Sequence, residues 1–312
     1  MDAAREAVER LWPGRQARVS ELGGGITNRN FKVEVEGSAY VLRMGGARTG
    51  LLGIDRAVEY AAGQRAWEVG VGPEVVAFVP EEGWLVARFI DGRPISVDQM
   101  RRPEVLARVA AALRAFHEAA PIPGRFDAVA VVDAYRDQAE AHGVEVPDEF
   151  DEARRVAARI AHARANPPLV PCHNDLLNAN FLDEAPPSAA PTPPHEWGGR
   201  VCIVDWEYAG MGDRFFDLAN FSVNHEFGVE EDRRLLASYF GEARGADLAA
   251  LRLMRFMSDF REAMWGVLQS GISDLDFDFM GYAGKHFARL EKTASEPAFE
   301  DYLAELGSRP SQ

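Results

Sequence analysis

The stretch CHNDLLNANFL, residues 172–182, sets one histidine, one aspartate and three asparagines among apolar side chains. In an ordinary buried strand, each of these amides and carboxylates would need a hydrogen-bond partner, or its burial would cost roughly 2 kcal/mol or more. The composition therefore predicts that these polar groups are used together at a site. The sequence on either side indicates which chemistry they suit.

The composition is typical of a globular protein with one or two domains. The chain has 312 residues, of which 47% are hydrophobic and 27% charged. No apolar run approaches the roughly 18 residues that would span a bilayer. The N-terminal sequence MDAAREAVERLW predicts an amphipathic helix and not a secretory signal. We therefore expect a cytoplasmic protein without membrane insertion.

The charge balance bears on the kind of partner. The chain carries 34 basic and 49 acidic residues, a net charge of −15, which repels nucleic acid and anionic lipid. We expect no nucleic-acid partner. A small cation would be attracted, but taken by itself the charge is explained better by solubility alone. The two cysteines, Cys172 and Cys202, lack metal-ligand spacing and are expected to be reduced core residues.

The first part of the chain predicts a small antiparallel sheet. Residues 17–44 contain two alternating apolar stretches around Glu36-Gly37-Ser38, which predict a β-hairpin preceded by another short strand. A helical pattern over residues 54–69 and two more strand patterns follow before residue 91. Residues 1–91 are thus expected to form a small lobe that consists of a sheet with one helix.

The second part of the chain predicts a mostly helical lobe over residues 92–312. The sequence DGRP at residues 91–94 is the candidate hinge, and long segments with apolar residues at helical spacing come after it. These segments cover residues 101–119, 147–165 and 230–256. The proline-rich stretch 183–199 predicts an exposed loop between two strands. The fold class is therefore α+β with two lobes.

The polar stretch has the H-x-D-x-x-x-x-N spacing of a kinase catalytic loop, with His173, Asp175 and Asn180 in the three positions. Phosphoryl transfer needs a carboxylate that orients and deprotonates the attacking hydroxyl, and Asp175 is the candidate. It also needs oxygen ligands for Mg²⁺. Asn180 and Asp205, which ends a short apolar strand, are predicted to supply them.

Each of these residues also has a purely structural interpretation. Asp175 and Asn180 could belong to a polar turn, and Asp205 could simply end a strand. Their order along the chain, with a glycine loop and a helical glutamate upstream, favours the functional interpretation. For His173 we expect that it holds the loop by hydrogen bonds and does not shuttle protons, and a structural role is expected still more for His117.

A glycine-rich segment lies between the first two predicted strands and is expected to cover phosphates. It does not lead from a strand into a helix, as a Rossmann turn would. The residues concerned are Gly23, Gly24, Gly25, Thr27 and Asn28. Arg43 on the third strand is the candidate phosphate-holding cation, with Lys32 as the alternative. Glu59 on the following helix is predicted to pair with Arg43, although it could equally face solvent.

Several segments together resemble the choline and ethanolamine kinases, within the larger aminoglycoside phosphotransferase-like family. They are CHNDLLNANFL, IVDWEYAG, FFDLAN, MWGVLQSGISDLDFDFMGYAGKHFARL, NRNFKVEVEGSAYVLRM and GPEVVAFVP, so the likeness covers most of the chain. It implies a protein-kinase-like fold, ATP and Mg²⁺, and transfer of a γ-phosphoryl group to a small alcohol. It also implies that adenine binds near Phe89 and Ile90 and that Asp217 supports the loop. The family's arginine in place of the protein-kinase lysine fits Arg43.

The resemblance also implies where the acceptor binds. The implied pocket residues are Glu207, Tyr208, Trp265 and Tyr282. Aromatic rings with a carboxylate nearby suit an ammonium group, although helix packing also explains the aromatic residues. The chain departs from the family twice. Glu262 or a neighbour replaces a second tryptophan, and Asn224 stands where an acidic residue is expected, with Glu226 two places further on.

The sequence itself argues against a protein kinase. After Asp205 the chain passes through residues 206–210 directly into the next predicted helix, with no activation segment. We therefore predict a kinase of a small cationic alcohol, choline or ethanolamine first, that is a monomer or a homodimer. The alternatives are an aminoglycoside, thiamine or other hydroxyl kinase of the same fold, and a non-catalytic nucleotide-binding protein.

Overall fold

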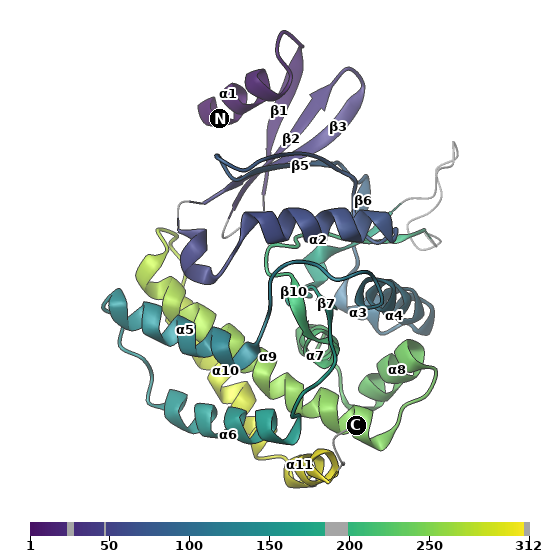
Figure 1. The fold of residues 1–312 in the computed structure, drawn as a ribbon, viewed down its shortest axis with the longest axis vertical. Helices are drawn as coiled ribbons and strands as arrows, with labels where there is room; N and C mark the ends of the chain where they lie inside the picture. The colour runs from purple at the N-terminus through teal and green to yellow at the C-terminus, as the bar shows by residue number, and fades with distance from the viewer. Residues whose placement is uncertain (24–27, 47, 185–198, 309–312) are drawn as a thin grey trace.

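The computed structural model describes residues 1–23, 28–46, 48–184 and 199–308. Two lobes stand one above the other, an upper one built around a sheet and a larger lower one built mostly of helices (Figure 1). The predicted α+β class with two lobes is confirmed. Gly24, Gly25 and Thr27 of the predicted phosphate-covering loop lie outside the described residues.

The small lobe contains a five-stranded antiparallel sheet in the order β1-β2-β3-β5-β4. The strands are β1 (Ala17–Leu22), β2 (Asn28–Val35), β3 (Ser38–Gly45), β4 (Val75–Val79) and β5 (Trp84–Arg88). Glu36 and Gly37 both have positive φ, 50° and 80°, which is the geometry of a two-residue hairpin turn that matches the strand twist. The predicted hairpin is therefore present.

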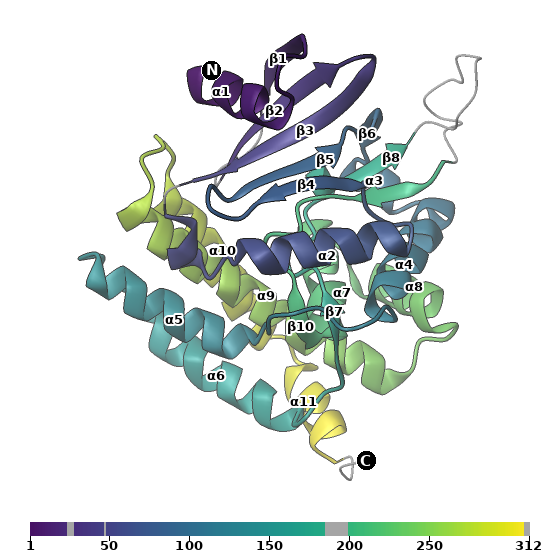
Figure 2. The ribbon, with the colours of Figure 1, turned by 45° about the horizontal axis from the view of Figure 1, so that its top comes forward.

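Two helices flank this sheet: the predicted amphipathic N-terminal helix, which the predicted sheet with one helix did not count, and the helix predicted over residues 54–69. Helix α1 (Asp2–Leu11) packs Ala4, Ala7 and Val8 against buried strand residues such as Phe31, and so closes a separate small core. Helix α2 (Arg56–Glu68) lies on the other side of the sheet, facing the large lobe (Figure 2). It begins at Asp55, whose carboxylate accepts from the amides of residues 57 and 58.

The large lobe is organised around one long helix. Its helices are α3 (Val97–Met100), α4 (Pro103–His117), α5 (Ala128–Ala141), α6 (Glu149–Ala163), α7 (Arg214–Asn224), α8 (Val229–Phe240), α9 (Gly245–Ile272), α10 (Phe279–Ala294) and α11 (Phe299–Gly307). Helix α9 is buried on nearly all sides because α5, α7, α10 and α11 pack around it. None of the helices among the described residues is long and apolar enough to cross a bilayer.

The helical pattern predicted over residues 230–256 is wrong as one element. The structure ends α8 at Gly241, which has φ 86°, and starts α9 at Gly245. A left-handed residue after a helix is favourable for glycine and lets the chain turn. The periodic apolar residues on both sides of this break pack into one core, which is why their spacing looked continuous.

Short strands of the large lobe carry the polar segments. They are β6 (Gly92–Pro94), β8 (Phe181–Glu184) and β9 (Val201–Ile203) in one sheet, and β7 (Leu169–Cys172) with β10 (Gly210–Asp213) in another. Strands β8 and β9 pair antiparallel, as expected for the two strands that the proline-rich stretch connects. Residues 185–198 of that stretch lie outside the described residues.

The two lobes are joined by the connection near residue 90 and by contacts elsewhere along their interface. Phe89 donates its amide to Ala39 O at 3.0 Å, whereas Ile95 donates to Phe181 O at 2.9 Å. The chain therefore passes from the small sheet to the large lobe between these two residues. On the opposite side, the Tyr135 hydroxyl of α5 donates to Leu52 O at 3.1 Å, and Arg48 bonds to Ile272 O.

Candidate active site

The polar loop after β7 is held from behind by one buried carboxylate. Asp217 of α7 accepts the amide of His173 at Oδ2 and the amide of Asn174 at Oδ1, both at 2.7 Å. Asn174 has φ 67°, a left-handed conformation that asparagine tolerates better than most residues. Two amides of a tight turn thus find their partners in a single side chain, which fixes the shape of the loop.

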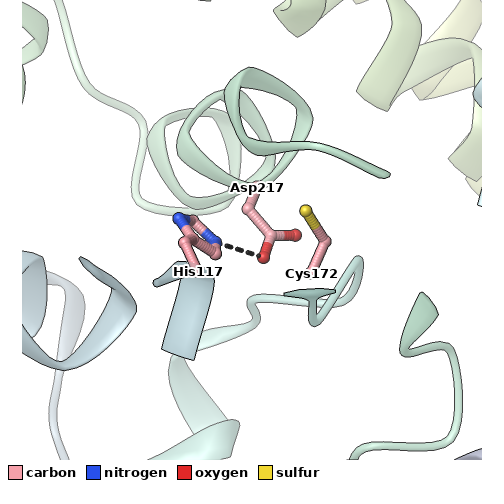
Figure 3. A group of neighbouring side chains, drawn as sticks. All are labelled: His117, Cys172 and Asp217. Atoms are coloured by element: carbon pink, nitrogen blue, oxygen red, sulfur yellow. Dashed lines mark hydrogen bonds and ion pairs between the residues drawn. The ribbon is translucent and has the colours of Figure 1, made fainter. Parts of the chain in front are cut away.

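Asp217 also belongs to a buried group with His117 and Cys172, whose potential ligand atoms lie within 4.8 Å of one another (Figure 3). His117 contacts Asp217 Oδ2 through Nε2 at 3.0 Å and the Tyr239 hydroxyl through Nδ1 at 2.7 Å. Burial raises the pKa of the Cys172 thiol well above its usual value. Because both imidazole nitrogens and both Asp217 oxygens are engaged, we interpret this group as a brace for the loop.

His173 is built into the loop by its ring, as predicted. Nε2 donates to Val204 O at 2.9 Å, and Nδ1 accepts the amide of Asp175 at 3.2 Å, so the ring is the neutral tautomer. Burial lowers its pKa, although nearby Asp217 opposes this effect. His173 therefore connects the loop to the segment that follows β9.

Asp175 occupies a partly exposed position at the end of this loop. Its side chain is 14% exposed, and Arg261 Nη2 of α9 lies 3.3 Å from Oδ1. Burial raises the pKa of Asp175 to about 7; Arg261 opposes the shift, and the charges of Glu262, Asp205 and Glu207 add to it. A carboxylate with a pKa near neutrality is well matched to accepting a proton from a hydroxyl.

Asn180 and Asp205 are brought together at the cleft between the lobes. Val204 donates its amide to Asn180 O at 3.0 Å, which ties the two segments to each other. Asn180 Nδ2 donates to Asp175 O at 2.8 Å, so its amide oxygen is the remaining polar atom of that side chain. An amide oxygen and a carboxylate are hard donors that suit Mg²⁺, and the side chain of Asp205 is 29% exposed.

Arg43 of β3 reaches the same place from the small lobe. Its Nη1 lies 2.6 Å from Glu59 Oε1 and 2.6 Å from Asp205 Oδ1. Burial by itself lowers the pKa of this guanidinium, but the two carboxylates raise it above its usual value. Lys32, the alternative cation, instead lies 4.4 Å from the centre of the Phe89 ring. The predicted Arg43–Glu59 pair is therefore present.

A buried network links the lobes through Arg56, which sequence analysis missed. Arg56 Nη1 lies 2.6 Å from Glu59 Oε2 and 3.2 Å from Glu207 Oε2. Arg56 Nη2 donates to Asn28 Oδ1 at 2.6 Å, and Asn28 Nδ2 donates to Glu207 Oε2 at 2.7 Å. Arg56 lies three residues before Glu59 on α2. This spacing places the two side chains on one face of a helix, and it is the sequence signal that could have predicted their pairing.

A cavity of about 440 Å³ opens between the lobes beside these residues. Several of the residues predicted to bind a nucleotide or metal line it: Gly23, Arg43, Glu59, Phe89, Ile90, Asn180 and Asp205. Because the amide of Phe89 already donates to Ala39 O, a base in this cavity would have to use other backbone groups of the connection. The cavity places such a ligand next to Asp205.

Three of the predicted acceptor residues, Tyr208, Trp265 and Tyr282, lie together. Trp265 Nε1 donates to the Tyr208 hydroxyl at 3.1 Å, and the Trp265 and Tyr282 rings meet edge to face at 5.7 Å. Tyr282 donates its hydroxyl to Glu262 Oε2 at 2.7 Å. Glu207, in contrast, turns its carboxylate towards the small-lobe network described above.

The two alternative pocket residues at the C-terminal end of α7, Asn224 and Glu226, make different contacts. Asn224 Nδ2 donates to Leu176 O of the polar loop at 3.4 Å. Glu226 is exposed, and its carbonyl accepts from Arg101 at 2.9 Å. Asn224 is therefore the one that contacts the loop. Arg261, which contacts both Asp175 and Tyr208, was not predicted.

Comparison with known proteins identifies the family of this chain. Residues 18–254 match the model of the phosphotransferase enzyme family. A probable ethanolamine kinase of Arabidopsis thaliana is 24% identical over 85% of this chain and 76% of its own length. A solved choline/ethanolamine kinase family protein from Mesorhizobium loti is 32% identical, with a TM-score of 0.81 over 99% of both chains.

A more distant structure shares the fold. The choline kinase LicA from Streptococcus pneumoniae is 20% identical, with a TM-score of 0.75 over 94% of this chain and 97% of its own. LicA has also been solved in complex with AMP. The family-wide match and the close structural relative together show that this chain belongs to the choline/ethanolamine kinase family of small-molecule phosphotransferases.

Proposed function

We propose that the protein transfers the γ-phosphoryl group of ATP to the hydroxyl of a small cationic amino alcohol, of the choline or ethanolamine type, with Mg²⁺ as cofactor. The observation that carries this proposal is the position of Asp175. Its backbone carbonyl accepts from Asn180, which lines the cavity bordered by Asp205. Its carboxylate lies 3.3 Å from Arg261, which contacts the Tyr208 ring that bonds to Trp265. A hydroxyl bound there would meet a phosphate held in the cavity.

The residues of the nucleotide side have distinct roles in this proposal. Arg43, held by Glu59, binds the phosphates of ATP, and Asn180 and Asp205 hold Mg²⁺. When bound, Mg²⁺ supplies charge neutralisation for the phosphate oxygens. In this proposal the glycine-rich segment covers the phosphates, and Arg56 and Glu207 hold Asn28 at the start of β2.

The transfer step itself needs little covalent chemistry from the protein. Asp175 orients the acceptor hydroxyl and accepts its proton as the hydroxyl oxygen forms a bond to the γ-phosphorus and the bond to the leaving ADP oxygen breaks. His173, Asn174 and Asp217 keep Asp175 in place. Most of the rate enhancement would therefore come from positioning and charge stabilisation.

Support for an amino alcohol comes from the named relatives and from the acceptor side of the site. The relatives bear the names ethanolamine kinase and choline kinase. Aromatic rings and carboxylates next to Asp175 suit an ammonium group. The net charge of −15 also favours a cationic substrate.

The test is the release of ADP from Mg²⁺-ATP against a panel of choline, ethanolamine, thiamine and aminoglycosides. We expect saturable stimulation by at least one amino alcohol and none by the aminoglycosides. Stimulation by aminoglycosides or thiamine alone would assign another acceptor class to the fold. Nucleotide binding without stimulation by any acceptor would instead point to a non-catalytic nucleotide-binding protein.

A further inference from the structure

The acceptor side of the site contains a buried cation that belongs to the protein itself. The Arg261 side chain of α9 is 2% exposed, and its guanidinium carbon lies 5.0 Å from the centre of the Tyr208 ring. Nη1 lies 2.8 Å from Glu262 Oε1, and Nη2 bonds to Asn174 O and lies 3.3 Å from Asp175 Oδ1. Four groups therefore hold this guanidinium in one place.

The Arg261 guanidinium covers one face of the Tyr208 ring, so this face is not free for an external cation. The Tyr208 ring is itself fixed, because its hydroxyl accepts from Trp265 Nε1 at 3.1 Å. A quaternary ammonium carries no N–H group, so its recognition depends on aromatic faces. At the Tyr208 face it would have to displace Arg261 or lie beside it, and two like charges in a buried region repel strongly.

Glu262 offers a different mode of recognition. Its side chain is 6% exposed, Oε2 accepts the Tyr282 hydroxyl at 2.7 Å, and Oε1 pairs with Arg261. An ionised carboxylate has about four lone-pair sites, so these two contacts leave acceptor capacity for N–H donors. Hydrogen bonds between a charged N–H group and a carboxylate are short and about twice as strong as neutral ones.

The charges of Asp175, Arg261 and Glu262 also fit an acceptor with one positive charge. When Asp175 and Glu262 are ionised, Arg261 neutralises one of the two carboxylates. One negative charge is left for a ligand. A single ammonium group with hydrogen atoms on its nitrogen satisfies both this charge and the lone pairs of Glu262.

We propose that Glu262 and Tyr282 bind the acceptor through N–H groups of its nitrogen, and that Arg261, by occupying the Tyr208 face, selects against fully methylated ammonium groups. This inference rests on the proposed kinase function. It makes Glu262 and Arg261 specificity-determining residues, and it names amino alcohols with at least one N–H group as the substrate class.

The experiment measures kcat/KM with Mg²⁺-ATP for ethanolamine, its N-methyl and N,N-dimethyl derivatives, and choline. We expect kcat/KM to fall with each added methyl group and to be at least tenfold lower for choline than for ethanolamine. Equal or better turnover of choline overturns the inference and leaves the kinase function standing. Stimulation by none of the four amines removes the proposed function as well.

Two variants, Glu262→Gln and Arg261→Met, test which residues cause the preference for ethanolamine over choline. Glu262→Gln keeps the side-chain shape, and we expect it to lower kcat/KM for ethanolamine ten- to a hundredfold, because a hydrogen bond to a charged group is lost, and for choline less than threefold. Glu296→Gln is the matched control, since Glu296 pairs with Arg252 in the N-terminal half of α9. We expect Glu296→Gln to leave the ethanolamine-to-choline ratio unchanged.

Arg261→Met frees the Tyr208 face and is expected to raise the choline-to-ethanolamine ratio of kcat/KM at least tenfold. Thermal unfolding and ATP binding report whether this variant is folded; if it is not, the Glu262→Gln ratio decides. An ethanolamine-to-choline ratio that is the same in wild type and Glu262→Gln contradicts the assignment of Glu262.

Discussion

Arg56 of the small lobe and Glu207 of the large lobe form a buried ion pair, with 3.2 Å between Nη1 and Oε2. Asn28, the first residue of β2, bonds to both of them. The start of β2 is therefore positioned by the large lobe as well as by its own sheet. This relationship couples the segment that follows the glycine loop to the residues after β9.

Removal of the Arg56 guanidinium should affect both the stability of the protein and its use of ATP. We expect Arg56→Met to lower the free energy of unfolding by about 3 kcal/mol, because the buried carboxylates of Glu59 and Glu207 both lose an ion-pair partner, and to raise the KM for ATP. Arg65→Met on the same helix is the control, since Glu68, its partner, is half exposed. If urea unfolding shows the same loss of unfolding free energy in both variants, the role of the Arg56 network is contradicted.

The catalytic assignment predicts a large effect at one carboxylate. Asp175→Asn removes the proton acceptor and keeps the side-chain shape, so we expect kcat to fall about 10²- to 10⁴-fold. The Kd for ATP, measured by calorimetry, should stay within about twofold because the phosphate-binding groups are untouched. Asp133→Asn, which affects an ion pair with Arg154 on α5 and α6, should retain full kcat.

The pKa of Asp175 predicts the pH dependence of the reaction. Burial raises this pKa to about 7, and a general base must be ionised, so kcat/KM should rise as pH increases through about 7 and then level off. In Glu262→Gln the loss of a neighbouring negative charge lowers the pKa of Asp175, and the midpoint should move to lower pH. A profile that is flat between pH 5.5 and 8 would rule out this assignment.

The metal assignment is testable at Asp205 without disturbing the backbone. Asp205 has φ 70°, a conformation in which asparagine is well tolerated, so Asp205→Asn removes charge but adds no strain. We expect the Mg²⁺ concentration for half-maximal activity to rise at least about tenfold, since a carboxylate ligand is lost. Asp274→Asn, whose side chain is 94% exposed, is the control in the same titration.

A histidine outside the site should make stability depend on pH. His225 is packed among Phe181, Phe221 and Phe227, and burial lowers its pKa to about 4. Since the unfolded pKa is about 6.5, its neutral form contributes stability above that pH, and the contribution is lost as pH falls towards 4. Between pH 7.5 and pH 5 the loss is about 2 kcal/mol.

The measurement compares urea unfolding of the wild type and His225→Gln at these two pH values. The variant should lose less stability on acidification than the wild type by about that amount. His142→Gln replaces an exposed histidine and should behave as the wild type does. The same pH dependence in all three proteins would assign the effect to other groups.

Local patterns predicted much of the fold and the nucleotide side of the site. The alternation around Phe31 and the turn at Gly37 define the hairpin, and the spacing from His173 to Asn180 lies within one loop. Arg43 and Glu59 are 16 residues apart on neighbouring elements, so their pairing could be predicted from the order of elements. Such features depend on short stretches of chain, where sequence determines geometry directly.

Contacts between distant segments were not predicted. Arg56 meets Glu207 across 151 residues, and Arg261 meets Asp175 across 86 residues. The sequence around Arg261 shows only that it is a charged residue on a mostly apolar helix. Its partners Asp175 and Tyr208 come from distant segments and depend on how α9 packs behind the loop. The contacts of Glu207 with Asn28 and Arg56 depend likewise on how the two lobes meet.

The brace at Asp217 has a consequence for the entropy of binding. An acceptor with four non-hydrogen atoms supplies at most about 6 kcal/mol of binding free energy, at about 1.5 kcal/mol per atom. Ordering a loop of several residues costs a similar amount, at about 1–2 kcal/mol per residue. Because Asp217 has already ordered the loop during folding, so small a ligand need not supply that free energy, and its few contacts remain available to orient the hydroxyl.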